Sequence, residues 1–217
     1  MNLIPLPFRH ILLISVILFW AMPSHAGELI IVKKGDSSNL LHPEKGFHID
    51  SEDGVAVLRD RWQTFVANAR TGDEFTLKIR MAIEKAHRSA ATVVLLHGEE
   101  WSHFGFSGSE EKMFTQGKAF TRDTNAAIKE RTTPQFILDG DMFEFVLTYR
   151  KTDPGMADLD ISINGESFVH QSGKCPPIDA VGLRPWISDI RVEAMTLGGK
   201  FEQGGVKPKR FDPPEKK

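Results

Sequence analysis

Cysteine is nearly absent from this chain of 217 residues, which contains one, Cys175. A single thiol excludes an intramolecular disulfide framework and any zinc module that needs several cysteines. Two prolines, Pro176 and Pro177, follow it. No run of histidine or lysine lies beside it to activate a thiolate. We therefore predict an inert, structural cysteine in a turn.

The chain also lacks an excess of either charge. It has 27 Lys and Arg against 29 Asp and Glu, a formal net charge of -2. A protein that binds duplex nucleic acid needs a basic surface for the phosphates, so we expect no nucleic-acid partner. The hydrophobic share of 41% and the charged share of 26% are ordinary for a globular chain. They exclude a mostly disordered, collagen-like or multi-span membrane protein.

Long hydrophobic runs are missing except at residues 11–22, near the N-terminus. Spanning a bilayer takes roughly 18 or more apolar residues, and this run is shorter. Small residues, Ser24 and Ala26, stand where a signal peptidase would require them. We predict a signal peptide over residues 1–26, with an uncleaved anchor as the alternative. The mature chain would then have no membrane span and would be periplasmic or secreted.

Helical periodicity is scarce, and alternation with period two is abundant. Residues 75, 77, 79 and 81 are apolar, and the residues between them are polar, which predicts a half-buried strand. Further strands are expected at residues 54–58, 64–67, 91–97, 103–106, 112–115, 143–149, 160–163, 166–170, 181–183 and 187–197. Short helical turns are expected at residues 83–88 and 124–129. The dipeptide Asn164-Gly165 predicts a type I′ hairpin turn.

These short strands predict an all-β fold over residues 27–197. We expect a two-sheet antiparallel jelly-roll sandwich with short helical turns in its loops. Residues 198–217, rich in glycine, proline and lysine, are predicted to be a disordered polar tail.

Six segments of the sequence carry a resemblance to a known family. They are residues 102–106, 112–117, 143–147, 160–166, 181–186 and 188–192. Their order resembles the concanavalin A-like lectin/glucanase superfamily. It is most similar to the laminin-G-like and keto-disaccharide hydrolase-type domains of secreted bacterial proteins. The resemblance covers roughly residues 29–197 and implies a jelly roll whose concave face or rim loops bind carbohydrate. It transfers no catalytic residue.

The catalytic motif of the laminarinase-type members is missing. Those enzymes use Glu-x-Asp-x-x-Glu on one strand, and no Glu in this chain has Asp two positions later. The nearest substitute is Asp139 and Asp141 with Glu144, for which Gly140 favours a solvated turn. The superfamily's calcium sites use clustered oxygen ligands. Asp36, Ser37 and Asn39 could supply such ligands, but nothing fixes a set, so we predict no metal and no other cofactor.

A polar segment from His97 to His103 is the one concentration of acid, base and metal-ligating groups. His97, Glu99, Glu100 and His103 could serve in acid/base chemistry or bind a divalent ion. Gly98 indicates a loop, and the spacing is not that of a helical zinc motif. We favour a polar hairpin loop at the rim of the sandwich.

Tryptophans beside polar groups are the better functional candidates, because sugar rings stack on indoles while their hydroxyls need polar partners. Trp101 and His103 are the first choice for ligand contact, and Arg184 and Trp186 the second. Trp62 has similar neighbours. The structural alternative is that each indole fills the core.

Three functions remain open from the sequence. The favoured one is an exported, non-catalytic module that binds a glycan. The second is a glycan-acting hydrolase or lyase that uses His97, Glu99, Glu100 and His103. The third is a sandwich with a structural or protein-binding role.

Overall fold

A computed structural model describes residues 25–60, 63–84, 90–107, 110–208 and 210. Its strands form two antiparallel sheets, one of eight and one of six strands. Sheet A contains β1 (His25–Lys33), β3 (Asp50–Glu52), β4 (Val55–Leu58), β6 (Ala69–Glu84), β10 (Phe143–Asp153), β11 (Met156–Ile163), β12 (Glu166–Lys174) and β14 (Asp189–Gln203). Sheet B contains β2 (Leu40–Leu41), β5 (Phe65–Ala67), β7 (Ala90–His97), β8 (Glu100–Ser107), β9 (Lys112–Gln116) and β13 (Ala180–Arg184).

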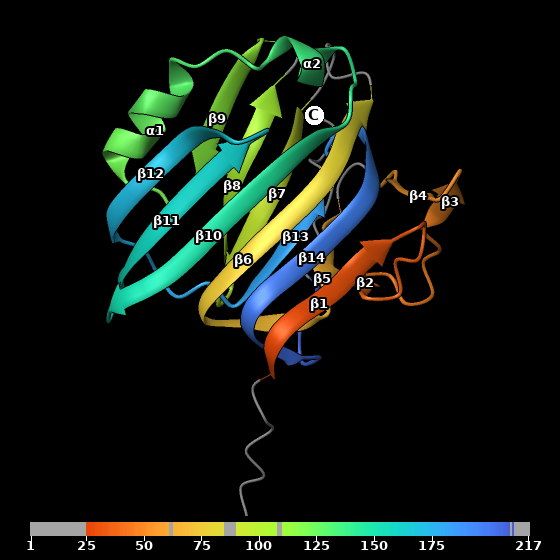
Figure 1. Ribbon diagram of the computed structural model, residues 1–217, viewed down its shortest axis with the longest axis horizontal. Helices are drawn as coiled ribbons and strands as arrows, with labels where there is room; N and C mark the ends of the chain where they lie inside the picture. The colour runs from red at the N-terminus through yellow and green to blue at the C-terminus, as the bar shows by residue number, and fades with distance from the viewer. Residues whose placement is uncertain (1–24, 61–62, 85–89, 108–109, 209, 211–217) are drawn as a thin grey trace, which may run out of the picture.

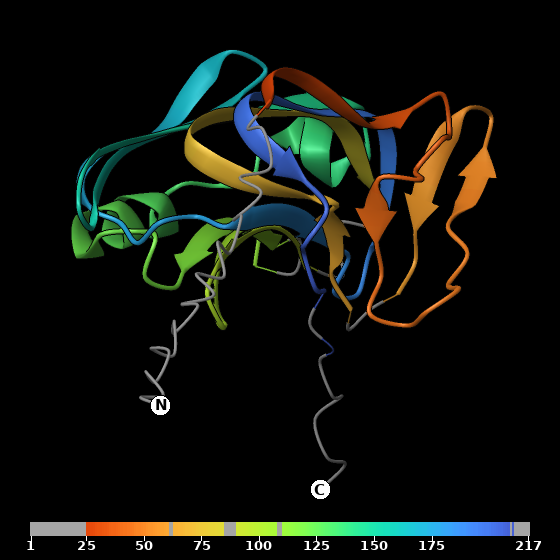
Figure 2. The same ribbon diagram turned by 90° about the horizontal axis from the view of Figure 1, so that it is seen from below.

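The two sheets lie face to face as the layers of a sandwich, with sheet A toward the viewer in Figure 1 and the layers seen from below in Figure 2. Sheet A has the order β12-β11-β10-β6-β14-β4-β3, with β1 also paired to β14. Sheet B has the order β2-β5-β13-β7-β8-β9. This confirms the predicted two-sheet antiparallel sandwich.

The core forms between the sheets from alternate residues of their strands. Phe75, Leu77 and Ile79 of β6 are buried there, and so are Val93 and Leu95 of β7. The residues between them, polar on β6 but including the apolar Val94 on β7, point the other way, as the period of two requires. Each sheet therefore has one face in the core and one outer face.

Short helices close one end of the sandwich. Helix α1 (Arg122–Lys129) contacts both β9 and β12, the edge strands of the two sheets. Thr121 caps the helix by accepting a hydrogen bond from the backbone N–H of Thr124. The prediction of a helical turn at residues 124–129 is confirmed. Helix α2 (Gln135–Leu138) was not predicted.

Two local predictions can be checked at single residues. Asn164 and Gly165 have φ values of 49° and 81°, the two positive angles of a type I′ turn. Cys175 is buried and has no disulfide partner. Burial raises the pKa of its thiol to about 11, which fits an inert structural role.

Several boundaries differ from the prediction. Strand β14 continues to Gln203, and Phe201 on it is only 7% exposed, so the folded part extends beyond residue 197 and the polar tail does not begin at residue 198. The expected helical turn at residues 83–88 is wrong at its start, where Ile83 and Glu84 end β6. Its remaining positions up to residue 88, and most of the predicted signal peptide, lie outside the described residues. Within the described residues no helix is long and apolar enough to cross a membrane.

Candidate functional site: the outer face of sheet B

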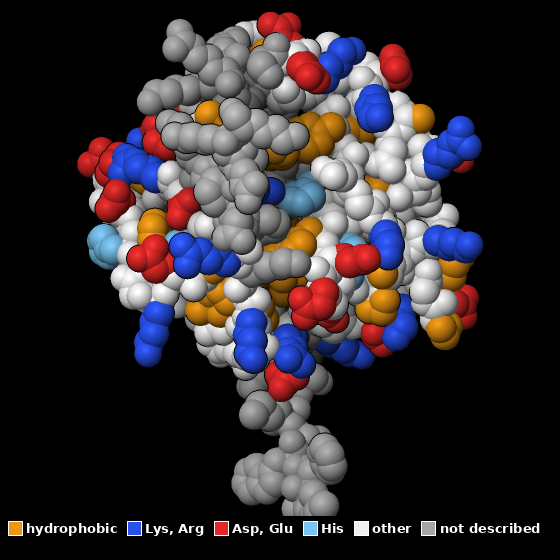
Figure 3. All heavy atoms as spheres, turned by 180° about the vertical axis from the view of Figure 1, so that it is seen from behind, with side chains coloured by type: hydrophobic (Ala, Val, Ile, Leu, Met, Phe, Trp, Pro, Cys, Tyr) orange, Lys and Arg blue, Asp and Glu red, His pale blue; other side chains and the backbone are white. Residues whose placement is uncertain are grey.

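The strand register of sheet B brings distant residues together on its outer face. In one row across the sheet, Val66, Gly182, Val94, His103 and Gln116 are successive partners. A second row runs through Arg184, Thr92, Gly105 and Phe114, and a third through Ala180, Leu96 and Trp101. We use the name outer face of sheet B for these residues. Figure 3 views the molecule from this side and shows hydrophobic side chains gathered near its middle.

Trp101 and His103 lie on a strand, which corrects the prediction of a rim loop. They belong to β8, and only Gly98 and Glu99 form the turn that connects it to β7. Gly98 has a φ of 62°, as the first central residue of a type II′ hairpin requires. The predicted rim loop is therefore a two-residue turn, and alternation along β8 places both side chains on one face.

Arg184 and Trp186 form an aromatic and cationic group at one end of this face. The guanidinium carbon of Arg184 lies 5.0 Å from the centre of the Trp186 ring, within the range of a cation–π contact. The centre of the same ring lies 6.4 Å from that of Phe114, and the two rings are nearly perpendicular. Gly105 makes room for Phe114, because a Cβ at this glycine would lie 2.1 Å from the phenyl ring.

His103 provides a neutral imidazole in the middle of the face. Its Nδ1 lies 3.3 Å from the hydroxyl oxygen of Thr92. Burial, assisted by the positive charge of Arg184, lowers the pKa of His103 to about 4. At neutral pH the ring is uncharged and can both donate and accept a hydrogen bond. This is the pattern that a sugar hydroxyl needs.

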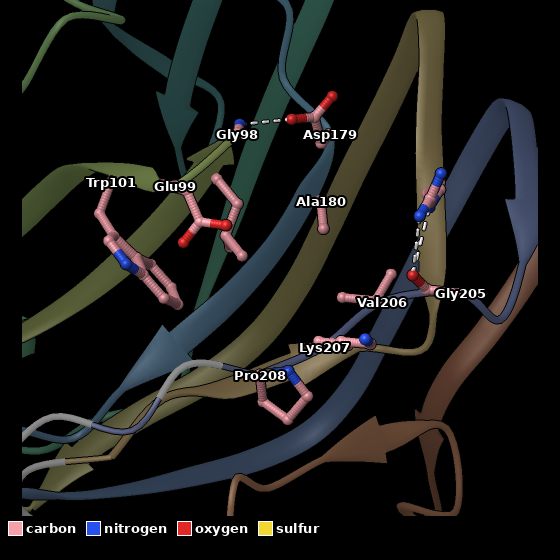
Figure 4. A pocket seen from close by; sticks show the side chains of 11 residues that line it. Gly98, Glu99, Trp101, Asp179, Ala180, Gly205, Val206, Lys207 and Pro208 are labelled. Atoms are coloured by element: carbon pink, nitrogen blue, oxygen red, sulfur yellow. Dashed lines mark hydrogen bonds between the residues drawn. The ribbon is translucent and has the colours of Figure 1, made fainter.

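A pocket of about 600 Å³ opens at the Trp101 end of the face (Figure 4). Its floor is apolar, since Trp101 and Val206 pack against a cluster that includes Leu96 and Ala180. On one side, Asp179 accepts a hydrogen bond of 2.5 Å from the backbone N–H of Gly98. The pocket therefore combines an indole, an apolar floor and a polar rim.

The C-terminal segment that follows Gly204, residues 205–208, forms another wall of this pocket. Gly204 and Gly205 have φ values of 88° and 72°, a region that favours glycine. They turn the chain from the end of β14 toward sheet B. Arg70 holds the turn by donating from Nε and Nη2 to the Gly205 carbonyl at 3.2 and 3.1 Å. Residues 206–208 also border a second hollow of about 400 Å³.

The alternative catalytic group is divided between the two sides of sheet B. His97 is buried, and its Nε2 lies 2.7 Å from the Ser102 hydroxyl. Its Nδ1 lies 3.8 Å from Glu100, which is itself paired with Lys118. His103 projects from the opposite face of the sheet, and Glu99 lines the pocket. The four predicted residues therefore do not converge on one site.

Ser102, His97 and Glu100 nevertheless have the order of a hydrolase triad. The serine side chain is fully buried and accepts a hydrogen bond from the backbone N–H of Ala119. Gly117 packs over it, because a Cβ there would lie 2.5 Å from the Ser102 oxygen. No substrate carbonyl can reach a hydroxyl in this position. Desolvation lowers the pKa of His97, which favours its neutral imidazole, and Glu100 is paired with Lys118, so this group is a structural network.

The other carboxylates singled out in the sequence hold turns. Asp36 accepts a hydrogen bond from the backbone N–H of Ser38, and Asn39 donates to the carbonyl of Ile30. Asp139 ends helix α2, and Gly140 follows it with a φ of 82°, which confirms the predicted turn. Among the described residues there is no group of three or more His, Cys, Asp or Glu side chains that could hold a metal ion.

Sequence reasoning missed part of the outer face of sheet B. Phe114 and Gln116 could have been found, because the predicted strand at residues 112–115 alternates and pairs with the one that carries His103. Val206 could not have been found, since nothing in a glycine-rich tail indicates that the chain returns to the sheet. Trp62 lies outside the described residues.

Comparisons with known proteins give a likeness in structure alone. No family model matches the chain, and no curated protein matches its sequence. Among solved structures, the alginate lyase Aly36B is similar with a TM-score of 0.53 and 11% identity, over 82% of this chain and 98% of that one. A legume lectin-like domain from Entamoeba histolytica has a TM-score of 0.50 and 11% identity, over 79% of this chain and 96% of that one. With the two antiparallel sheets, these likenesses establish the fold as a concanavalin A-like jelly-roll sandwich.

Proposed function

We propose that this protein is an exported, non-catalytic module that binds a glycan on the outer face of sheet B. The observation that carries the proposal is the convergence of Trp101, His103 and Arg184 on one face of one sheet. The sequence singled out these residues for their chemistry. Trp101 and His103 share β8, and Arg184 comes from β13, which is far from β8 in the chain. Trp186 joins them through its contact with Arg184.

The chemistry of the face suits a polyhydroxylated ligand. Trp101 and Trp186 are partly exposed and offer ring faces for the apolar side of a sugar. Gln116 is exposed and offers donors and acceptors for hydroxyls, and the buried Thr92 contacts Nδ1 of His103, which leaves Nε2 of that ring for a ligand. Gly105 makes room for the Phe114 ring, which adds another aromatic side chain to this face. The similar solved structures include proteins named as a lyase of alginate and as lectin-like, which supports a carbohydrate ligand.

The non-catalytic choice is supported by the division of the candidate acid/base groups. A glycosidase needs two carboxyl groups that flank the bond to be cleaved. At the Trp101 end the carboxylates are Glu99 and Asp179, and Asp179 is bonded to the Gly98 amide. The single tyrosine of the chain, Tyr149, is buried against Phe75 and cannot act on a bound sugar. The narrower likeness to laminin-G-like or keto-disaccharide hydrolase-type domains stays a prediction.

Replacement of Trp101 tests the proposal. We expect the exported protein, with its N-terminus checked by mass spectrometry to begin at Gly27, to bind glycans on an array. In calorimetry, Trp101→Ala should weaken the best of these ligands by about tenfold, which corresponds to about 1.4 kcal/mol. The reason is the loss of a stacking surface at the pocket.

Phe168→Ala is the matched control, because this aromatic residue lies on β12 of sheet A under Arg131. It should leave affinity unchanged. A wild-type protein that binds no glycan, or a Trp101→Ala variant with unchanged affinity, would contradict the proposal. Release of cleaved or unsaturated products from the bound glycan would instead establish the enzymatic alternative.

A further inference from the structure

The charged side chains on the outer face of sheet B are all of one sign. Along the described strands, the positions that point away from the core include two charged residues, Arg184 on β13 and Lys112 on β9, and no carboxylate. Alternation places Lys112 there, since Met113 and Thr115 on either side of Phe114 are buried. The carboxylates Glu99 and Asp179 lie at the far end, in the turn region of the pocket.

Arg184 is a cation with little exposure to solvent. Its residue is 9% exposed, and the Trp186 ring covers one side of the guanidinium. Its field also acts on His103, which stays neutral and adds no positive charge at pH 7. A charge in such surroundings is screened less than one at the surface, so an anion beside it is bound more strongly.

The pocket at the Trp101 end adds further basic groups. Lys207 lines it, and Arg70 lies at its edge with its guanidinium bonded to the Gly205 carbonyl. A ligand that extends from Trp186 to Trp101 would therefore meet Arg184 at one end and, at the other, basic side chains together with Glu99 and Asp179. The planar fork of arginine matches the oxygens of a carboxylate or a sulfate.

We propose that the ligand is an acidic saccharide, which binds through a carboxylate or sulfate at Arg184 while a sugar ring stacks on a neighbouring indole. This inference rests on the proposed function and specifies its ligand class. Both kinds of acidic saccharide carry an anionic group on a sugar, and the two anionic groups differ in geometry. A carboxylate is planar, whereas a sulfate ester is tetrahedral.

Calorimetry with four probes tests the inference on the exported protein. The probes are a uronate oligosaccharide, a sulfated oligosaccharide, a neutral gluco-oligosaccharide of similar length, and polyglutamate as an anion without sugar. We expect one acidic saccharide to bind at least about tenfold more tightly than the neutral one. Polyglutamate should bind weakly, because it lacks a ring to stack. Whether the uronate or the sulfated probe binds better identifies the anionic group.

Substitutions then locate the anion. Arg184→Gln should lower the affinity for the acidic saccharide by at least about tenfold and the affinity for the neutral one by a much smaller factor. Arg184→Lys, which keeps the charge but loses the fork, should retain part of the affinity. Arg150→Gln is the matched control, since Arg150 lies on the outer face of sheet A, 2.6 Å from Asp158; it should bind as the wild type does.

Two measurements do not depend on the folding of the Arg184 variants. The affinity of the wild type for the acidic saccharide should fall as salt is raised, and Lys112→Gln should weaken it by a smaller factor. Equal affinity for neutral and acidic saccharides, equal affinity for polyglutamate, or absence of a salt effect would overturn this inference. Binding of neutral sugars that depends on Trp101 would leave the proposed function standing, whereas failure of every saccharide to bind would remove both.

Discussion

The outer faces of the two sheets differ in the side chains that they carry. On sheet A, cross-strand partners are ion pairs: Arg150 lies 2.6 Å from Asp158, and His170 lies 2.6 Å from Asp160. On sheet B, the outward residues are mostly aromatic, apolar or small, with a few polar or cationic side chains such as Gln116 and Arg184 among them. A face covered by its own ion pairs is solvated without a ligand, whereas a face of rings, glycines and a few cations is suited to one. This difference is why we place the site on sheet B.

Acid should produce the largest difference between the two faces. The pKa of His103 is lowered from 6.5 to about 4, so the unfolded chain takes up this proton before the folded protein does. Stability from this residue is therefore present above pH 6.5 and lost as the pH falls toward 4, by up to about 3 kcal/mol. The groups that face it are Thr92 on β7 and Gln116 on β9, the neighbouring strands, and Arg184 on β13, two strands away. Urea unfolding at a series of pH values measures the loss.

The His103→Gln variant should lack this part of the pH dependence. His170 is the matched histidine on sheet A, where Asp160 raises its pKa. Its charged form is favoured by folding, so His170→Gln should not make the protein more resistant to acid. An identical pH dependence in the wild type and His103→Gln would show that the imidazole of His103 is not held neutral.

The second largest expected difference between the two faces is the change in stability when a glycine is replaced by alanine. A Cβ at Gly182 would lie 2.4 Å from the backbone carbonyl oxygen of Phe65, and one at Gly198 would have its nearest neighbour at 3.8 Å. Gly182→Ala should lower the free energy of unfolding by about 2 kcal/mol or more, because a backbone contact cannot move aside. Gly198→Ala on sheet A should be neutral or slightly stabilising. Equal midpoints of thermal unfolding for both variants would contradict the tight packing of β13 against β5.

The smallest expected effect concerns the apolar cover of sheet B. Val206 packs on the cluster of Val66, Val94, Leu96 and Ala180, whereas Ile30 on sheet A is 43% exposed. Val206→Thr should cost about 1 kcal/mol, since it brings a hydroxyl against an apolar surface. Ile30→Thr should have a smaller effect, measured by chemical denaturation. A neutral Val206→Thr would mean that residues 204–208 contribute nothing to this face.

The strands could be predicted from the sequence because their pattern is local. Each buried strand shows its period of two within a few residues, as in residues 75–81, and the Asn164-Gly165 turn needs only its own two φ angles. The short strands β2 and β3 and helix α2 were missed because they show too few alternations or turns of helix to give a pattern, whereas the longer β1 was missed because its apolar run at residues 29–32 does not alternate. The end of β14 was missed because its glycines indicated a tail, whereas pairing with β1 and β6 keeps them in the sheet.

Candidate ligand residues could be selected by their chemistry, but their arrangement could not. Trp101, His103 and Arg184 were singled out as side chains beside polar neighbours. His97 was singled out in the same way, and the pattern gave no reason to separate it from His103. The separation follows from the register of β7 and β8, which directs His97 inward to Ser102 and His103 outward to Thr92.

By itself the sequence determined the class of fold, since strand alternation and turn chemistry act between neighbouring residues. Only the tertiary structure decided which side chains share a surface. That outcome depends on strand order, on register and on the turn at Gly204 and Gly205, all of which join residues that are far apart in the chain. The physical reason is that a strand shows in its own sequence that it has two faces, but which partner lies beside each face is fixed by the packing of the whole sandwich.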